Sequence, residues 1–493
     1  MKKLRHLIFA AVFAASIAAH AKPNVIFILA DDLGYGDTGF SFQNRRPAAE
    51  ARIQTPNLDR LASEGVVLTD HYCAAPVCAP SRASIMTGRL QGRCSVKNNM
   101  FDHPITEKDT LGTLMSGAGY RTMAIGKWGI GGGGESGTPV SAHPLDKGFG
   151  SFYGFMDHMA GHTYYHYDGF IRGAYMGIWD GREKATDGAK GIYSTDLFTA
   201  RAKKEISQAV REHPGEPFFL YMAVNAVHGS GQSDSTLVNR HPLHVPGRPY
   251  PEEGLSWPLK PEPPEDRNTW IDPRCRDFAN ENMQRYATAI ARLDDAIGDL
   301  TAHLEKLGVA GDTIIIFTSD NGPADEYGAD TRFFRSAGPF DGLKRDVYEG
   351  GMRVPAFVWR KGGFDVKEDG SPSISTDWMA TLAELAGTEK PESCDGVSLL
   401  PRWTGGKGEK SRIETVYCGG RSQEKDFAEF AARKRDLVRG EQRMRRDGDI
   451  VMLQAGGADK PWRRYNVKED PHQDRDLDEQ VTPGHSAGPS PAP

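Results

Sequence analysis

Four short apolar runs in this chain each end abruptly at polar residues. The runs are rich in β-branched and aromatic side chains and occupy residues 24–30, 121–125, 218–224 and 313–318. Such runs predict strands that are buried on both faces. Helical patterns lie between them, at residues 58–64 and 282–307. Because strand and helix alternate, we expect an α/β fold with a large, mostly parallel sheet sandwiched by helices.

The chain is long enough for more than one structural unit. Its 493 residues exceed the size at which a single hydrophobic core usually stops growing. The segment from Gly229 to Pro273 is rich in proline, histidine and charge without a clear period, which predicts an excursion over the rim of the functional site. After an expected helix at residues 378–386, the composition shifts near residues 405–410. We expect a main α/β domain over residues 22–408, a smaller C-terminal α+β domain over 409–477, and a disordered tail over 478–493.

The first 21 residues have the features of a secretory signal peptide. A basic start is followed by an apolar stretch from Leu7 to Ala19 and by Ala19-His20-Ala21, an A-x-A cleavage site. The apolar stretch is short for a membrane span, although an uncleaved anchor is the alternative. We therefore expect cleavage after Ala21, no membrane span in the mature protein, and a periplasmic or secreted location.

Charge and cysteine content narrow the classes of partner and scaffold. The formal net charge of −6 gives no electrostatic reason to expect nucleic acid as a partner. Six cysteines in an exported protein permit up to three disulfides, and Cys394 with Cys418 is one candidate pair. This cysteine density is too low for a disulfide-scaffold protein.

Acidic and amide side chains follow the first and last of the four apolar runs. Asp31 and Asp32 come directly after one run, and Asp320 and Asn321 follow the other. In parallel sheets, functional groups gather beyond the carboxyl ends of the strands. Three carboxylates and one amide oxygen favour Ca²⁺ or Mg²⁺ over zinc, and in an exported protein we expect Ca²⁺. The alternative for the aspartate pair is an ordinary turn or helix cap.

A twelve-residue segment from Cys78 to Arg89 reads Cys-Ala-Pro-Ser-Arg-Ala-Ser-Ile-Met-Thr-Gly-Arg. It resembles the signature of type I, formylglycine-dependent sulfatases of the alkaline-phosphatase superfamily. The resemblance implies an alkaline-phosphatase-like fold, and oxidation of Cys78 to formylglycine, whose hydrate attacks sulfur. A helix that follows could point its N-terminal amides at an anion. The alternative is a buried structural thiol in a loop-to-helix turn.

The same resemblance implies roles for other side chains, in the family's chain order. Arg82 holds the nucleophile, Lys127 and Lys344 bind sulfate, and His228 protonates the departing alcohol. The metal ligands implied by the family are Asp31, Asp32, Asp320 and Asn321, with one oxygen of the residue formed at Cys78. Any one of these lysines or the histidine, taken alone, is more often a surface or packing residue.

One position departs from the family pattern. Many sulfatases have Gly-Lys-Trp-His, whereas this chain has Gly126-Lys127-Trp128-Gly129, so a histidine near the nucleophile is missing. The segment 157–166 contains histidines that could replace it or contact substrate, and His162 is the one we favour. The alternative is a loop stabilised by ordinary side-chain contacts.

The resemblance predicts a sulfatase that hydrolyses sulfate monoesters, arylsulfatase-like in sequence and acting on sulfated carbohydrate. It also implies a formylglycine-generating or sulfatase-maturating enzyme as a partner. Two alternatives remain. One is a phosphodiesterase or phosphonate hydrolase of the same superfamily, and the other, suggested by Gly129, is a catalytically silent binder of sulfated glycans.

Overall fold

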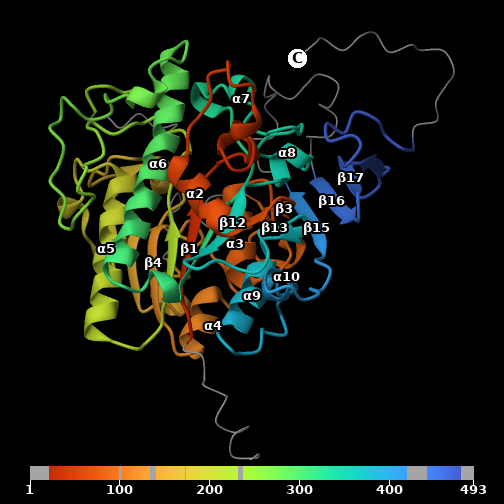
Figure 1. Cartoon of the computed structure of the whole chain (residues 1–493), viewed down its shortest axis with the longest axis horizontal. Helices are drawn as coiled ribbons and strands as arrows, with labels where there is room; N and C mark the ends of the chain where they lie inside the picture. Colours follow the sequence, from red (N-terminus) through yellow and green to blue (C-terminus); the bar gives the residue numbers. More distant parts are fainter. Residues whose placement is uncertain are drawn as a thin grey trace, which may run out of the picture.

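A computed structural model describes residues 22–98, 103–133, 140–171, 174–230, 237–418 and 441–478. The predicted signal peptide and most of the predicted tail lie outside these residues. The four predicted strands are present as β1, β4, β10 and β11, of which β1 and β4 are labelled in Figure 1. Their bounds are Asn24–Ala30, Arg121–Lys127, Phe218–Ala223 and Thr313–Ser319.

These strands form the centre of a ten-stranded sheet with the order β13-β2-β12-β11-β1-β10-β4-β5-β8-β9. The five strands from β11 to β5 are parallel, and antiparallel strands flank them on both sides. The outer strands are β2 (Val66–Leu68), β5 (Ser151–Phe155), β8 (Trp179–Asp180), β9 (Glu183–Lys184), β12 (Ala356–Arg360) and β13 (Glu368–Asp369). Because β11, β1, β10 and β4 are neighbouring parallel strands, their carboxyl ends lie at the same edge of the sheet.

Both faces of the sheet are buried. Along β1, Ile26 and Ile28 pack into one apolar core, while Val25, Phe27 and Leu29 pack into another on the opposite face. All five side chains are fully buried, and each such burial stabilises the fold by about 1.5–3 kcal/mol. The continuous apolar run in the sequence therefore reflects helices on both sides of the sheet.

Two groups of helices cover these faces (Figure 1). One core includes residues of α2 (Pro56–Glu64), α5 (Ser194–Glu212) and α6 (Glu281–Lys306). The other includes residues of α3 (Cys78–Thr87), α4 (Leu111–Gly117), α9 (Asp377–Leu385) and α10 (Leu400–Trp403). Two further one-turn helices are α7 (Thr331–Phe334) and α8 (Glu349–Met352). The helices expected at residues 58–64, 282–307 and 378–386 are confirmed as α2, α6 and α9.

The start of α2 is satisfied by a side chain from another helix. Thr55 precedes α2 and makes no side-chain capping bond. Instead the buried carboxylate of Asp294, in α6, accepts hydrogen bonds from the backbone N–H groups of Asn57 (3.1 Å) and Leu58 (2.8 Å). This contact joins the two helices and satisfies amides that would otherwise lack partners.

The described residues beyond 408 include a four-stranded antiparallel sheet, so the smaller C-terminal unit contains a sheet of its own. Its strands are β15 (Ile413–Cys418), β16 (Glu441–Asp447), β17 (Ile450–Ala455) and β18 (Arg463–Asn466). Two glutamines from this unit hold a segment of the main domain. Gln442 Nε2 donates to Arg345 O (2.9 Å), and Gln473 Oε1 accepts from the Glu349 backbone (2.8 Å).

Small ladders and loops complete the description. Two further two-stranded ladders pair β3 (His71–Tyr72) with β14 (Ser373–Ile374) and β6 (Phe170–Ile171) with β7 (Ala174–Tyr175). The described part of the excursion over residues 229–273 is free of strands and α-helices, as expected. No helix among the described residues has the length and apolar character needed to cross a membrane.

The candidate disulfide is corrected by the structure. Cys394 is a free, buried thiol, and its Sγ lies 3.9 Å from the carbonyl oxygen of Gly396. It packs in the apolar core on the α3 side of the sheet, where the thiol acts as a small hydrophobic side chain. The sequence could not show this, because spacing along the chain does not determine where a cysteine points.

Candidate active site

The carboxyl ends of four neighbouring parallel strands carry the predicted site residues. Asp31 and Asp32 follow β1, Asp320 and Asn321 follow β11, and Lys127 is the last residue of β4. His228 lies shortly after β10 and Lys344 lies in the segment before α8. The side chains of all these residues are buried. The fold therefore brings together groups that are up to 313 positions apart in the sequence.

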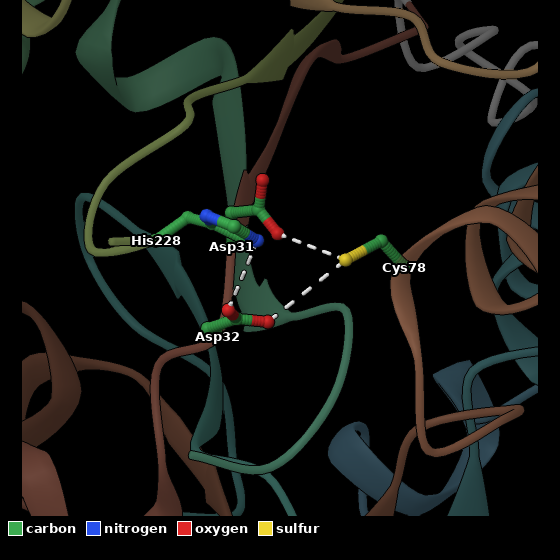
Figure 2. A group of neighbouring side chains, drawn as sticks. All are labelled: Asp31, Asp32, Cys78 and His228. Carbon is green, nitrogen blue, oxygen red and sulfur yellow. Dashed lines mark hydrogen bonds and ion pairs between the residues drawn. The ribbon is translucent and has the colours of Figure 1, made fainter. Parts of the chain in front are cut away.

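Cys78 is the first residue of α3 and faces the aspartate pair (Figure 2). Its thiol lies 3.4 Å from Asp31 Oδ1 and 3.9 Å from Asp32 Oδ1. Burial, together with the negative charge of Asp31, raises the pKa of the Cys78 thiol well above its ordinary value. The side chain is not exposed and forms no disulfide, so it is a protonated thiol at the start of a helix.

Arg82 lies one turn further along α3 and is fully buried. Its Nε and Nη2 atoms lie 2.9 and 2.8 Å from Asp320 Oδ2, and Nη2 is 3.5 Å from Asp31 Oδ2. Nη1 donates to the carbonyl oxygen of Lys127 at 3.0 Å. Arg82 thus holds the ends of β1, β4 and β11 together beside Cys78.

One lysine lies on the Asp31 side of the site. Lys127 Nζ donates to Asp31 Oδ2 at 2.6 Å, and both side chains are fully buried. Burial alone would raise the pKa of Asp31. The positive charges of Lys127 and Arg82 outweigh that effect and hold the pKa well below its ordinary value. Asp31 is therefore an ionised carboxylate directly beside Cys78.

A second lysine lies on the Asp32 side, in contact with a histidine. Lys344 Nζ donates to Asp32 Oδ2 (2.7 Å) and lies 3.1 Å from His228 Nε2. Burial opposes the charge of Lys344, but Asp32 and other nearby anions raise its pKa well above the ordinary value. Burial and the Lys344 charge lower the pKa of His228. Lys344 is thus the protonated donor, and His228 Nε2 is an acceptor.

The donor set fits a hard divalent cation. Ligand atoms of Asp31, Asp32, Cys78 and His228 all lie within 4.8 Å of one another. Asn321 Nδ2 donates to Asp32 Oδ1 (2.7 Å), while Asn321 Oδ1 is buried and, among the described residues, accepts no hydrogen bond. A buried amide oxygen without a donor, next to the ionised carboxylate of Asp31 and the carboxyl group of Asp32, suits Ca²⁺ or Mg²⁺.

Asp320 belongs to the same cluster through its hydrogen bonds. Its Oδ1 accepts from the Asp32 backbone N–H at 3.2 Å, and its Oδ2 is bound by Arg82. Burial and the nearby charge of Asp31 raise the pKa of Asp320 to about 7. Three carboxylates in one buried site repel one another, which is an arrangement that a bound cation relieves.

The space beside Gly129 is filled by a histidine from another segment. A Cβ atom at Gly129 would lie 3.5 Å from His158 Nδ1 and 3.7 Å from Lys127 Cε. His158 is 2% exposed. Burial and the positive charge of Lys127 lower the pKa of His158, while the negative charge of Asp31 acts in the opposite direction. Its imidazole therefore lies on the Asp31 side of the site, next to the position where many sulfatases have their histidine.

His162 takes a different place. Its ring stacks on that of His228, with centroids 4.0 Å apart and an interplanar angle of 10°. Gly161, in the same turn, packs directly against the side chain of Lys127. The segment 158–162 therefore contacts Lys127 through Gly161 and His228 through His162. His158, rather than His162, lies beside Gly129.

Two residues that the sequence did not indicate also surround the site. Glu326 lies 3.5 Å from Lys344 Nζ and 2.5 Å from Arg345 Nη1, and these cations lower the pKa of Glu326 to about 2 despite its burial. The neighbouring Tyr327 is 36% exposed, and its ring centroid is 6.4 Å from that of His228. No motif marks either residue, because the surrounding segment has no regular period.

Comparisons with known proteins agree with this geometry. The model of the Sulfatase family matches residues 23–388. The chain belongs to the sulfatase family. It is 31% identical to mouse arylsulfatase J over 76% of this chain, and it spans 54% of that relative's length. It is 29% identical to N-acetylgalactosamine-6-sulfatase of Sus scrofa, over 81% of this chain and 70% of the relative.

The fold of this sulfatase is also similar to that of solved structures. The crystal structure of Ps i-CgsB in complex with k-i-k-neocarrahexaose matches with a TM-score of 0.67 and 24% identity. That match covers 92% of this chain and 88% of the other. Sheet, helices and C-terminal unit thus follow an arrangement already seen in solved structures.

Proposed function

We propose that this sulfatase hydrolyses sulfate monoesters through a formylglycine formed at Cys78. The observation that carries the proposal is the position of the Cys78 side chain. It lies at the first turn of α3, 3.4 Å from Asp31, between one lysine that contacts Asp31 and another that contacts Asp32. A nucleophile placed there has a carboxylate cluster on one side and fixed positive charge on both flanks.

We assign the metal site to Asp31, Asp32, Asp320 and Asn321 together with the residue formed at Cys78, and we take the ion to be Ca²⁺. When bound, the cation and the matured residue supply an acidified nucleophilic oxygen and stabilise negative charge on sulfate. The oxygen-rich donor set supports this choice over a transition metal. The first turn of α3 adds N–H groups and a positive helix end next to the anion.

The chain's own cations stabilise the charge that develops during S–O cleavage. Lys127 and Lys344 are held by Asp31 and Asp32, so neither ammonium needs to reorganise when sulfate enters. Arg82 contacts Asp320 and Asp31 rather than open space. We therefore assign to Arg82 the positioning of the carboxylates and to the two lysines the contact with sulfate.

The departing alcohol needs a proton, and the pair formed by Lys344 and His228 can supply it. The 3.1 Å contact places one transferable proton between Nζ and Nε2. The S–O bond to the alcohol breaks, its electrons stay on the alcohol oxygen, and that oxygen takes this proton. Stacking of His162 on His228 fixes the plane of the ring whose Nε2 shares this proton with Lys344. His162 is thus assigned to positioning and to the rim of the substrate site.

We further assign to His158 the role of the histidine that many sulfatases have at the position of Gly129. The 3.5 Å approach of His158 Nδ1 to the position of a Gly129 Cβ supports this role. We expect His158→Ala to lower kcat strongly and His162→Ala to act more on KM. Peptide mass after quenching on an aryl sulfate gives a second readout, because sulfate retained on the Cys78 peptide would rise only in the His158 variant. Equal effects of both variants would remove this assignment.

The substrate class we propose is a sulfated saccharide. One relative is named for a sulfated amino sugar, and the exposed ring of Tyr327 beside His228 offers a surface on which a sugar can stack. We also propose export by the signal peptide at residues 1–21, a periplasmic or secreted location, and maturation by a formylglycine-generating or sulfatase-maturating enzyme.

The test compares substrates on protein whose Cys78 peptide has the mass of formylglycine. Released sulfate is measured on a panel of defined sulfated saccharides and on p-nitrophenyl sulfate, with phosphate diesters in parallel. We expect turnover of sulfate esters. Dominant diester turnover would favour the phosphodiesterase alternative. Glycan binding without sulfate release from fully matured protein would favour the silent binder.

A further inference from the structure

A cavity of about 500 Å³ lies between the C-terminal halves of α5 and α6, away from the strand ends that carry the active site. The segment 253–257 of the long excursion forms its third wall. Leu255 N–H and Tyr250 OH both donate to Asp299 on α6, at 2.7 and 2.9 Å, and so fasten this segment to the helix. Figure 1 shows α5 and α6 side by side at the outer surface.

The walls of this cavity are predominantly basic. Its cationic side chains outnumber the carboxylates of Glu253 and Asp299, and they are Lys203, Lys204, Arg211 and Lys306. Asp299 already has a positively charged partner, because Lys203 Nζ lies 2.5 Å from its Oδ1. Arg211 Nη2 pairs with Glu212 Oε1 at 3.2 Å, whereas within the described part of the chain no carboxylate pairs with Lys204 or Lys306. A chain with a net charge of −6 thus concentrates unpaired positive charge in one concave place.

An aromatic side chain stands beside these cations. Trp257 is half-buried, and Lys204 Nζ lies 5.4 Å from its ring centroid. The same indole also lines a second cavity of about 310 Å³, whose walls include Tyr175, Asp168 and Asp187. Aromatic rings provide stacking surfaces, and carboxylates can accept hydrogen bonds from sugar hydroxyls. The two cavities therefore offer anion-binding and sugar-binding chemistry next to one shared tryptophan.

We propose that this groove, formed by the two cavities that share Trp257, is a second binding site for a sulfated glycan chain. The inference rests on the proposed function, since it assumes a sulfated saccharide as substrate. Lys204, Arg211 and Lys306 bind sulfate groups, and Trp257 stacks on a sugar ring. A site separate from the reaction centre would retain a polymeric substrate between catalytic events and would be irrelevant to a small aryl sulfate.

The test uses the full chain with Cys78→Ala, so that binding is measured without turnover. Probes are a sulfated galactan, a sulfated fucan and a glycosaminoglycan, each with its desulfated form. We expect Lys204→Gln with Lys306→Gln to weaken binding of the preferred sulfated polymer about tenfold. The matched control is Lys410→Gln with Lys460→Gln, two exposed lysines of the C-terminal unit that do not line the groove. Trp257→Ala should weaken the same binding.

Separate measurements distinguish this inference from the proposed function. In matured protein that retains Cys78, the two groove substitutions should leave p-nitrophenyl sulfate turnover and the unfolding midpoint unchanged. Absence of all turnover with intact, groove-dependent glycan binding would reject the catalytic proposal and keep the groove. Equal affinity of the groove and control variants would overturn the groove. Competition by DNA as strong as that by the sulfated polymer would also overturn it, since that result indicates unspecific binding of polyanions.

Discussion

Replacing Arg82 should lower the free energy of unfolding far more than replacing an exposed arginine. Arg82 and Asp320 are both fully buried, and the guanidinium makes two contacts of 2.8 and 2.9 Å to one carboxylate oxygen. Removing one partner of a buried pair leaves an uncompensated charge, which costs about 3–5 kcal/mol. We therefore expect Arg82→Met to lower the free energy of unfolding by about 3–5 kcal/mol in chelator-treated protein.

The assay is urea unfolding with linear extrapolation, and the control is Arg182→Met. Arg182 pairs with Asp146 at 2.5 Å, but both side chains are 55% exposed, so that loss should be about 0–1 kcal/mol. Adding Asp320→Asn to Arg82→Met should recover part of the loss, because the second change removes the buried carboxyl group that has lost its partner. An Arg82→Met protein as stable as the Arg182→Met protein would refute the reasoning. If Arg82→Met does not fold, Arg82→Lys replaces it, since lysine keeps the charge.

Three further predictions concern the nucleophile, the sulfate site and the α2 cap. Cys78→Ala should abolish sulfate release while leaving the unfolding midpoint nearly unchanged, and retained activity would exclude Cys78 as the nucleophile. Lys344→Ala should lower kcat by about 10²–10³-fold, as expected for a preorganised charge, and a normal kcat/KM would remove it from the site. Asp294→Ala should destabilise the protein by about 1–3 kcal/mol, because two backbone N–H groups lose their acceptor. Burial raises the pKa of Asp294 from 3.8 to about 7, so its contribution is present at low pH and is lost as pH rises through that range. Unfolding free energy compared with Asp294→Asn should fall from pH 4 to pH 7, and a parallel pH profile would contradict this.

The strand ends could be predicted because the sequence marks them directly. Each buried strand is an uninterrupted apolar run, and the polar residue that ends it, such as Asp31 or Asp320, must lie at the sheet edge where parallel strands stop. The first residue of α3 was equally predictable from the local motif at Cys78. These positions depend on periodicity and on nearby residues, which a single sequence contains.

The rest of the site depends on contacts that leave no local pattern. The sequence showed that an imidazole was missing at Gly129, but choosing His158 over His162 required the path of the turn between them. The pairing of Glu326 with Lys344 and Arg345 depends on how two irregular segments fold against each other. The cap that Asp294 provides for α2 joins positions far apart, with nothing in either segment to indicate it.

The hydrogen bonds from Gln442 and Gln473 connect the C-terminal unit to the segment of the main domain that follows Lys344. Both act on the backbone of residues 345–349, immediately after Lys344. An enzyme shortened to end before β15 would keep every proposed catalytic side chain. It would lose the two glutamine hydrogen bonds that hold the segment next to Lys344. Attempts to minimise or recombine this protein should therefore carry both units together, and substitutions far from the reaction centre, in this small sheet, are a route by which turnover can be tuned.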